Sequence, residues 1–289
     1  MKYHSDHLSR DPAIVTAKAD AMYDSSRPGF IHALRRKEDH EGWTELTFPG
    51  GFVCTTNSSP IETELEYNEV VAMKEYLRSG ISVSDGDTVI DVGANVGIFA
   101  MHLLRGVQGL TIHAIEPVPD TFEVLKSNMA RYPHRPVYLH NIAIGAGVDS
   151  TLEIVLYPHL TGNATACPEV TQMQREWLSG HLTAEEITYL YTEERVTVPC
   201  TTLSSFFRTH SIEHIDLLKI DTEGSELNIL SGVEPGDWSK IDQVALEVHD
   251  EQRSLGPITA LLERYGMRVT VDAASRDPSG TIVATAVRA

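Results

Sequence analysis

A chain of 289 residues is long enough for one large α/β domain with additions, or for two modest domains. Hydrophobic residues make up 42% and charged residues 22%, which is close to the average of globular proteins and excludes wholesale disorder and fibrous repeats. The formal net charge of −18 repels phosphate backbones and anionic membrane surfaces, so we expect neither a nucleic-acid partner nor a membrane partner.

We expect neither export nor membrane insertion from this sequence. No apolar stretch approaches the roughly 20 residues of a bilayer helix, and the N-terminus lacks the apolar run of a secretory signal. Cys54, Cys167 and Cys200 are odd in number and widely spaced, which fits neither a disulfide framework nor a metal clip. We therefore expect free thiols and a cytoplasmic protein.

The N-terminal part of the chain is interpreted as a cap, residues 1–60, on a domain that spans residues 61–289. Within the cap, residues 43–54 have the β-rich, turn-interrupted pattern of a short hairpin. Residues 62–77 repeat apolar side chains at helical spacing and predict one helix. Glu66 and Glu69 of this helix are expected to face solvent, and Tyr67 is a candidate to cover a site.

From residue 88 onward, short runs rich in Val and Ile alternate with helical segments. Parallel strands require this alternation, because each crossover between them needs a helix. The last two segments, 267–274 and 281–289, are typical of an antiparallel pair. The sequence therefore predicts an α/β fold with a doubly wound, mostly parallel sheet and antiparallel C-terminal strands. The other strands and helices are expected within 88–97, 98–106, 110–117, 120–132, 137–145, 216–224, 225–233, 243–250 and 258–266.

A polar stretch at about residues 161–195 is longer than a connection in such a fold needs. We interpret it as an inserted lid over a site, and the alternative is a structural flap that shields a sheet edge. Its aromatic residues Trp177, Tyr189 and Tyr191 either line an apolar substrate pocket or pack within amphipathic helices.

The strongest chemical signal is a hydrophobic strand that runs into a glycine-containing turn and then into a helix, at residues 89–97. Gly93 and Gly97 suit a turn that takes unusual dihedrals and approaches a ligand closely, since a Cβ would clash there. Free amides at the start of the helix favour an anionic group. Asp91 can hold a cationic or hydroxyl-bearing part of the same ligand. The ligand is expected at the topological switch point of the sheet.

Glu116 closes the next predicted strand, about 19 residues beyond the turn. In dinucleotide-type folds an acidic residue at this place accepts hydrogen bonds from ribose hydroxyls. The turn lacks the third glycine of the dinucleotide fingerprint, which disfavours a nicotinamide cofactor. S-adenosylmethionine fits better, because it has a ribose and an adenine but no pyrophosphate.

Several segments together resemble the FkbM-type family of S-adenosylmethionine-dependent methyltransferases in spacing and order. They are DVGANVG, a Glu-Pro pair followed by a helix that ends in SNM, the strand end NIAIG, LLKIDTEGSELNILSG and ALEVH. The resemblance covers about residues 86–250. It implies the class I methyltransferase fold, which is Rossmann-like, and S-adenosylmethionine as the cofactor.

The resemblance also assigns cofactor contacts by position. The turn residues would cradle the methionine end, with Asp91 beside it: Gly93, Ala94, Asn95 and Gly97. Glu116, followed by Pro117, would bind the ribose, and the adenine side would fall at Asn141, Ile142 and Ala143. The K-x-D-x-E-G motif of the family matches Lys219, Asp221, Glu223 and Gly224.

Asp221 and Glu223 are candidate catalytic residues. Asp221 ends a predicted strand beside the cofactor cleft, where it could accept the proton of an acceptor hydroxyl, bind the ammonium group of the cofactor, or bind a metal. Glu223 could act as a base, or it could cap the helix that begins near Ser225.

Glu247 and His249 lie on the same side of a predicted strand, because side-chain direction alternates with period two. His249 is a candidate general base that titrates near neutrality. Alternatively, Asp221, Glu247 and His249 together hold a divalent cation such as Mg, Mn or Fe. We do not expect a metal requirement.

The sequence thus predicts an enzyme, most simply an O-methyltransferase of secondary metabolism that acts on a hydroxyl group of a small-molecule or carrier-linked metabolite. Two alternatives remain: a nicotinamide-dependent oxidoreductase, and a nucleoside-binding module that has kept the fold without catalysis. A homodimer is compatible with the sequence. The first sixty residues and the insert lie outside the recognisable pattern, so the resemblance does not transfer the acceptor.

Overall fold

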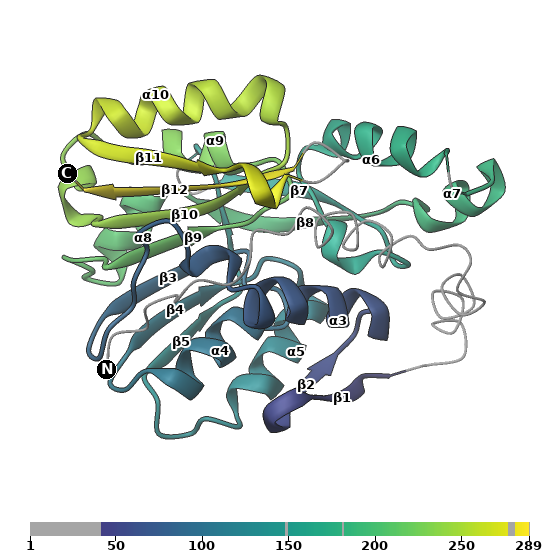
Figure 1. The fold of residues 1–289 in the computed structure, drawn as a ribbon, viewed down its shortest axis with the longest axis horizontal. Helices are drawn as coiled ribbons and strands as arrows, with labels where there is room; N and C mark the ends of the chain where they lie inside the picture. Colours follow the sequence, from purple (N-terminus) through teal and green to yellow (C-terminus); the bar gives the residue numbers. More distant parts are fainter. Residues whose placement is uncertain (1–41, 148–149, 181, 277–280, 289) are drawn as a thin grey trace.

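The computed structural model describes residues 42–147, 150–180, 182–276 and 281–288 (Figure 1). Most of the predicted cap, residues 1–41, lies outside the described residues. The predicted hairpin is confirmed: β1 (Thr44–Phe48) pairs antiparallel with β2 (Phe52–Thr56) across the turn Pro49–Gly51.

The hairpin is bound to the main domain through a buried asparagine. Asn128 of α5 (Pro119–Met129) accepts the backbone N–H of Thr55 at 2.8 Å and donates to its carbonyl at 2.7 Å. The same amide donates to the carbonyl of Val96 at 2.8 Å. One side chain therefore links β2 to the glycine-containing turn.

The predicted helix 62–77 is confirmed for its first part only. Helix α3 (Pro60–Tyr67) begins with a capping box between Ser59 and Glu62 and continues as a π-helical turn over Asn68–Ala72. The chain then leaves the helical path at Lys74, whose φ is +54°, and a short 3-10 helix follows at Glu75–Leu77. This break buries the ring of Tyr76 edge-on against Phe99, with ring centroids 5.7 Å apart.

The central sheet confirms the predicted architecture. It has seven strands in the order β11-β12-β10-β9-β3-β4-β5. The parallel strands are β3 (Thr88–Val92), β4 (Thr111–Ile115), β5 (Val137–His140), β9 (Leu217–Ile220) and β10 (Gln243–Val248). Strand β12 (Ile282–Arg288) runs antiparallel between β10 and β11 (Met267–Asp272). The edge strand is therefore β11, and the last strand of the chain lies one position further in.

Helices cover both faces of this sheet, as a doubly wound fold requires. Helices α4 (Ile98–Gly106) and α5 lie on one side, and α8 (Leu203–Thr209), α9 (Glu226–Ser231) and α10 (Gly256–Arg264) lie on the other (Figure 1). Each side has its own apolar cluster, and strand residues such as Val89 and Ile90 contribute to opposite clusters. Strands buried on both faces explain the continuous runs of Val and Ile in the sequence. Together with the strand order, this is the class I methyltransferase fold.

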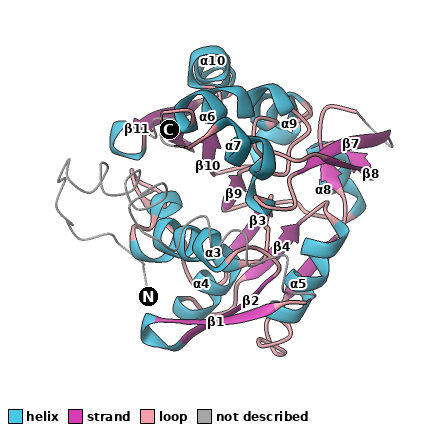
Figure 2. Cartoon of the chain, turned by 90° about the vertical axis from the view of Figure 1, so that its right-hand side faces the viewer, coloured by secondary structure: helices cyan, strands magenta, loops and turns pink. Residues whose placement is uncertain are grey.

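A second, smaller sheet carries the insert. Its order is β6-β8-β7, with β6 (Ala143–Ile144), β7 (Ser150–Leu156) and β8 (Glu194–Thr201). Helices α6 (Thr171–Leu178) and α7 (Ala184–Leu190) project from it, next to each other (Figure 2). Tyr191 is buried in a separate apolar cluster of this insert, against which Trp177 and Tyr189 pack. Of the two interpretations of these aromatic residues, the structure supports packing.

None of the described helices combines the length and the apolar character needed to span a bilayer. Cys54, Cys167 and Cys200 all carry free thiols, as expected.

Candidate active site

A pocket opens at the carboxyl ends of β3, β4, β9 and β10, where parallel α/β sheets place their ligands. Helix α3, the small sheet and the first part of the insert complete its walls. Seven carboxylates line it: Glu62, Glu66, Glu69, Glu116, Asp221, Glu223 and Glu247. Among the described residues, the lining contains no Lys or Arg, and His249 is its one basic side chain.

The turn after β3 depends on Gly93. Its φ is +75°, and a Cβ at this position would lie 1.7 Å from the carbonyl oxygen of Asp221. Its amide and that of Ala94 both donate to the carbonyl of Ile115 at 3.0 Å. The turn is therefore fixed between β4 and β9, and only glycine fits there. Gly93 itself lines the pocket.

At Gly97 a side chain is excluded by helix packing and not by contact with the neighbouring strand. Gly97 caps α4 with a φ of +93°, and a Cβ there would lie 2.6 Å from Leu125 and 2.9 Å from Met129 of α5. Gly97 and Ala94 lie outside the pocket lining. The second glycine of the motif thus permits helix packing behind the turn.

Glu116 lies at the centre of the predicted cofactor site. One carboxylate oxygen accepts the backbone N–H of Asn95 at 3.0 Å, and the other accepts that of Val118 at 2.8 Å. Burial raises the pKa of Glu116 to about 7, and the two N–H donors oppose this shift. Each oxygen keeps a further lone pair for a ligand.

Of the residues assigned to the adenine side, some line the pocket and one supports the strand end behind it. Pro117, Ile142 and Ala143 line the pocket. Asn141 lies outside the lining, and its amide donates to the carbonyls of Glu116 and Pro117, at 2.9 Å each. It therefore holds the end of β4 in place.

A buried cation lies beneath the turn. The ammonium group of Lys219 lies 3.1 Å from Asp91 and 3.5 Å from Asp221, and it donates to the carbonyl of Gly93 at 2.9 Å. Burial alone lowers the pKa of Lys219, but the two carboxylates outweigh it and raise that pKa above its ordinary value. Asp91 is fully buried and outside the lining, so it acts on the pocket through Lys219 and not by direct contact.

Tyr76 joins the two carboxylates at the ends of β9 and β10. Its hydroxyl lies 2.9 Å from Asp221 and 2.8 Å from Glu247. Nothing in the sequence pattern singles out Tyr76, because it occupies an apolar position of a helical repeat. Burial raises the pKa of Asp221, but Lys219 and His249 outweigh it and hold that pKa below its usual range. Asp221 is therefore ionised near neutral pH.

His249 is held between two glutamates. Its Nε2 lies 3.2 Å from Glu223, and its Nδ1 lies 3.1 Å from Glu226. Burial lowers the pKa of His249, but these carboxylates outweigh it and raise the pKa well above its ordinary value. The expectation of a base that titrates near neutrality is thus replaced by an imidazolium, because both ring nitrogens face carboxylates.

Glu226 is a site residue that the sequence analysis missed. It is fully buried, and one of its oxygens accepts the backbone N–H of Gly224 at 2.9 Å and that of Thr222 at 3.3 Å. Glu226 therefore closes the turn before α9. No described side chain forms a capping hydrogen bond at the start of α9, so the structure does not support the alternative in which Glu223 caps that helix. Glu223 lines the pocket instead and has a φ of +53°.

The three residues considered as metal ligands do come together. Asp221, Glu247 and His249 each offer a ligand atom, and these atoms lie within 4.8 Å of one another. His249 would have to release the proton that its two glutamate partners stabilise before it could bind a cation. A metal requirement stays outside our expectation.

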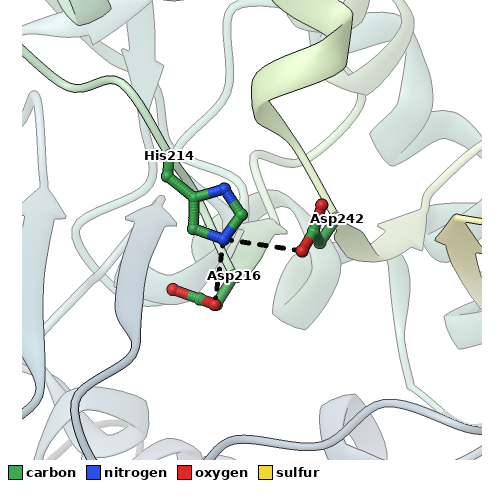
Figure 3. Close-up of side chains that lie close together, drawn as sticks. All are labelled: His214, Asp216 and Asp242. Carbon is green, nitrogen blue, oxygen red and sulfur yellow. Dashed lines mark hydrogen bonds and ion pairs between the residues drawn. The ribbon is translucent and has the colours of Figure 1, made fainter.

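A second cluster of one histidine and two acids lies at the opposite ends of the strands, the amino ends. Nε2 of His214 lies 3.2 Å from Asp216 and 3.5 Å from Asp242, just before β9 and β10 begin (Figure 3). Asp216 also accepts the backbone N–H of Thr88 at 2.8 Å. The group therefore joins the amino ends of β3, β9 and β10, away from the pocket.

Two acids, one on α3 and one in the π-helical turn after it, correct a sequence-based expectation. Glu66 and Glu69 line the pocket, although solvent exposure was expected for both. Glu66 contacts the turn after β3 through the side-chain amide of Asn95, at 2.9 Å. Tyr67 stacks on Phe48, with ring centroids 4.3 Å apart, and does not line the pocket.

The insert contacts the turn after β9 directly. The hydroxyl of Thr165 donates to the carbonyl of Glu223 at 2.5 Å, and a Cβ on Gly224 would lie 2.6 Å from Val170. Residues 161–164, Ala166 and Gln174 line the pocket. The first part of the insert is thus a wall of the site, and its action as a lid stays a prediction.

The close approach at Gly93 can be tested against a glycine in open space. We expect Gly93→Ala to destabilise the fold by clearly more than about 1–2 kcal/mol, which is the cost of a left-handed conformation alone. Gly86→Ala is the matched control, because Gly86 has a φ of +94° and a Cβ there would meet nothing within 4 Å. Urea unfolding measures both variants, and equal losses would contradict the contact with Asp221.

The protonation of His249 is a second prediction. Glu226→Gln keeps the acceptor oxygen but removes one charge, so the pKa of His249 should fall towards 6.5. The stability that the raised pKa contributes is complete below pH 6.5 and is lost as the pH rises through the folded-state value, so the wild type should lose more stability over this range than the variant. NMR titration of the imidazole, assigned with His249→Gln, measures the shift. Exposed His214 is the internal control, and an unchanged His249 titration would refute the assignment.

Comparison with known proteins supplies the family. The model of the FkbM methyltransferase domain matches residues 91–269. The chain is 34% identical over 238 residues to a Streptomyces tacrolimicus protein named 31-O-demethyl-FK506 methyltransferase FkbM, and the match covers 79% of this chain and 89% of the relative. It is 29% identical over 222 residues to Methyltransferase 1 of Beauveria bassiana, and this match covers 76% of this chain and 87% of the relative.

Among solved structures, the methyltransferase FkbM of Methylobacillus flagellatus aligns with a TM-score of 0.49 at 14% identity, covering 93% of this chain and 61% of that one. The sequence matches span the turn after β3, the end of β4 and the motif after β9, which are the segments that build the pocket. The chain therefore belongs to the FkbM methyltransferase family.

Proposed function

We propose that this methyltransferase transfers a methyl group from S-adenosylmethionine to a hydroxyl group of a small-molecule or carrier-linked metabolite. The observation that carries the proposal is the acidity of the pocket, whose lining holds seven acidic side chains and, among the described residues, no Lys or Arg. Burial raises the pKa values of Glu66 and Glu116, and a cationic ligand would favour their ionised forms. S-adenosylmethionine has a sulfonium and an ammonium group against one carboxylate, so its net charge is positive. Such a lining attracts a cationic cofactor.

The same charge argues against the nicotinamide alternative. A dinucleotide carries two negative charges on its pyrophosphate, and proteins bind that group with glycine-rich helix N-termini and basic side chains. Here the amide of Asn95 is already bonded to Glu116, and the nearest acids of α3 face the same turn. A pyrophosphate in this position would meet carboxylates.

The described residues fit the parts of the cofactor. Glu116 offers two oxygens to a ribose diol, each with one N–H bond already in place. Ile142 and Ala143 offer an apolar surface for a base, and Gly93 leaves room for close approach. When bound, the cofactor supplies an electrophilic methyl group on sulfur.

A hydroxyl acceptor is supported by the pocket and by one relative. The name of the Streptomyces tacrolimicus protein describes transfer to an oxygen, at 34% identity over most of both chains. Transfer to a hydroxyl forms an O–CH3 bond, breaks an S–CH3 bond and requires a base for the hydroxyl proton. Carboxylates at the ends of β9 and β10 are available for that proton.

We assign the base to Glu247. Asp221 is a weaker base, because Lys219 and His249 stabilise its charge. His249 is already protonated, so it cannot accept a second proton. In this arrangement Tyr76 positions Glu247, while His249 and Lys219 keep the neighbouring carboxylates in place.

Cofactor binding is the first test of the proposal. We expect saturable one-to-one binding of S-adenosylmethionine by calorimetry and none of NAD or NADP. Glu116→Ala should weaken the affinity about tenfold or more, because two charge-assisted hydrogen bonds are lost. Glu123→Ala, an exposed position on α5, is the control. NAD binding in place of S-adenosylmethionine would overturn the assignment.

Catalysis is the second test. Glu247→Gln should lower kcat about 10²-fold to 10⁴-fold while the affinity for S-adenosylmethionine stays unchanged, because it removes only the proton acceptor. Mass spectrometry of a metabolite extract incubated with methyl-labelled cofactor identifies the acceptor and measures the rate. Full activity of this variant would assign the proton to another group.

A further inference from the structure

A carboxylate on α3 contacts the turn after β3 from outside the region that matches the family. Oε2 of Glu66 accepts a hydrogen bond from the side-chain amide of Asn95 at 2.9 Å. Asn95 has a φ of +49°, an uncommon conformation for a residue other than glycine, and this places its side chain towards α3. Glu66 also lines the pocket.

Glu66 has no cationic partner in contact with it among the residues that the structure describes. Burial raises its pKa to about 8, and the charge that opposes this most strongly is that of Lys219. Lys219 is itself in contact with Asp91 and Asp221, so its charge is already balanced there. The raised pKa means that the ionised form of Glu66 is costly without a counter-charge, and a cationic ligand in the pocket would offset that cost and favour the ionised form.

The position of Glu66 along the pocket identifies the part of the ligand it faces. Asn95 bonds Glu116 through its backbone N–H and Glu66 through its side chain, so the two glutamates flank one residue. Ile142 and Ala143 lie beyond Glu116 at the β5 side of the sheet. The charged groups that act on Glu66 are Lys219, Asp221 and Asp91, which belong to the β3–β9 side, and Glu69, which lies in the π-helical turn after α3.

With the ribose at Glu116 and the adenine towards β5, the amino-acid part of the cofactor extends towards β9. We propose that Glu66, oriented by Asn95, binds the ammonium group of that amino-acid part. The inference rests on the proposed cofactor and assigns a new ligand-binding residue within the same pocket. An ammonium group offers three donors, and Glu66 offers one oxygen free of the Asn95 bond.

The test compares three ligands by calorimetry: S-adenosylmethionine, S-adenosylhomocysteine and 5′-methylthioadenosine. The first two carry the ammonium group, the first alone carries the sulfonium charge, and the third lacks the amino-acid part. Glu66→Gln keeps an acceptor for Asn95 but removes the charge. This variant should lower the affinity for the first two ligands by about tenfold or more and leave the affinity for the third unchanged.

Glu64→Gln is the matched control, because Glu64 lies on the same helix, is exposed and does not line the pocket. If Glu66→Gln lowered the affinity for all three ligands equally, the role of Glu66 would be purely structural and the proposal would be overturned. A lower affinity for S-adenosylmethionine alone would place Glu66 next to the sulfonium group and would also overturn the proposal. If the wild type bound none of the three, the proposed function itself would fail, which is a distinct result.

Discussion

The buried ammonium group of Lys219 is the interaction on which the rest of the site depends. It lies between Asp91 of β3 and Asp221 after β9, and it holds the carbonyl of Gly93 in the turn. The ring of Tyr76 faces it at 5.2 Å. A buried charge is tolerated only when it is paired and hydrogen-bonded, so these four groups are fixed relative to one another. Removing Lys219 would leave two carboxylates unbalanced beneath the pocket.

The acidic lining follows from that arrangement. Lys219 and His249 are each matched by at least two carboxylates, so their charges are balanced within the walls. The acids that line the pocket then determine the sign of its charge. A positive cofactor completes the balance, which connects the electrostatics of the fold to the methyl-transfer chemistry of the family.

Much of the fold could be predicted from the sequence because its signals are local. The runs of Val and Ile, the turn at Gly93 and the acid at Glu116 each follow from backbone and burial rules within a short segment. The helix ending at Leu77 could not be predicted, because its break at Lys74 serves a tertiary contact of Tyr76. The solvent assignment of Glu66 and Glu69 failed for the same reason: a helical pattern does not say what covers each face.

The sequence by itself determined the class I fold, the position of the pocket at the strand ends and the family, since the alternation of strands and helices and the spacing of the motifs are encoded by consecutive residues. Only the tertiary structure decided the roles of individual side chains. It set Gly97 against α5, Asp91 behind Lys219, and Glu226 in the turn before α9. It also provided His249 with two carboxylate partners that keep it protonated. A protonation state depends on charges a few ångströms away in space, and those charges come from distant parts of the chain.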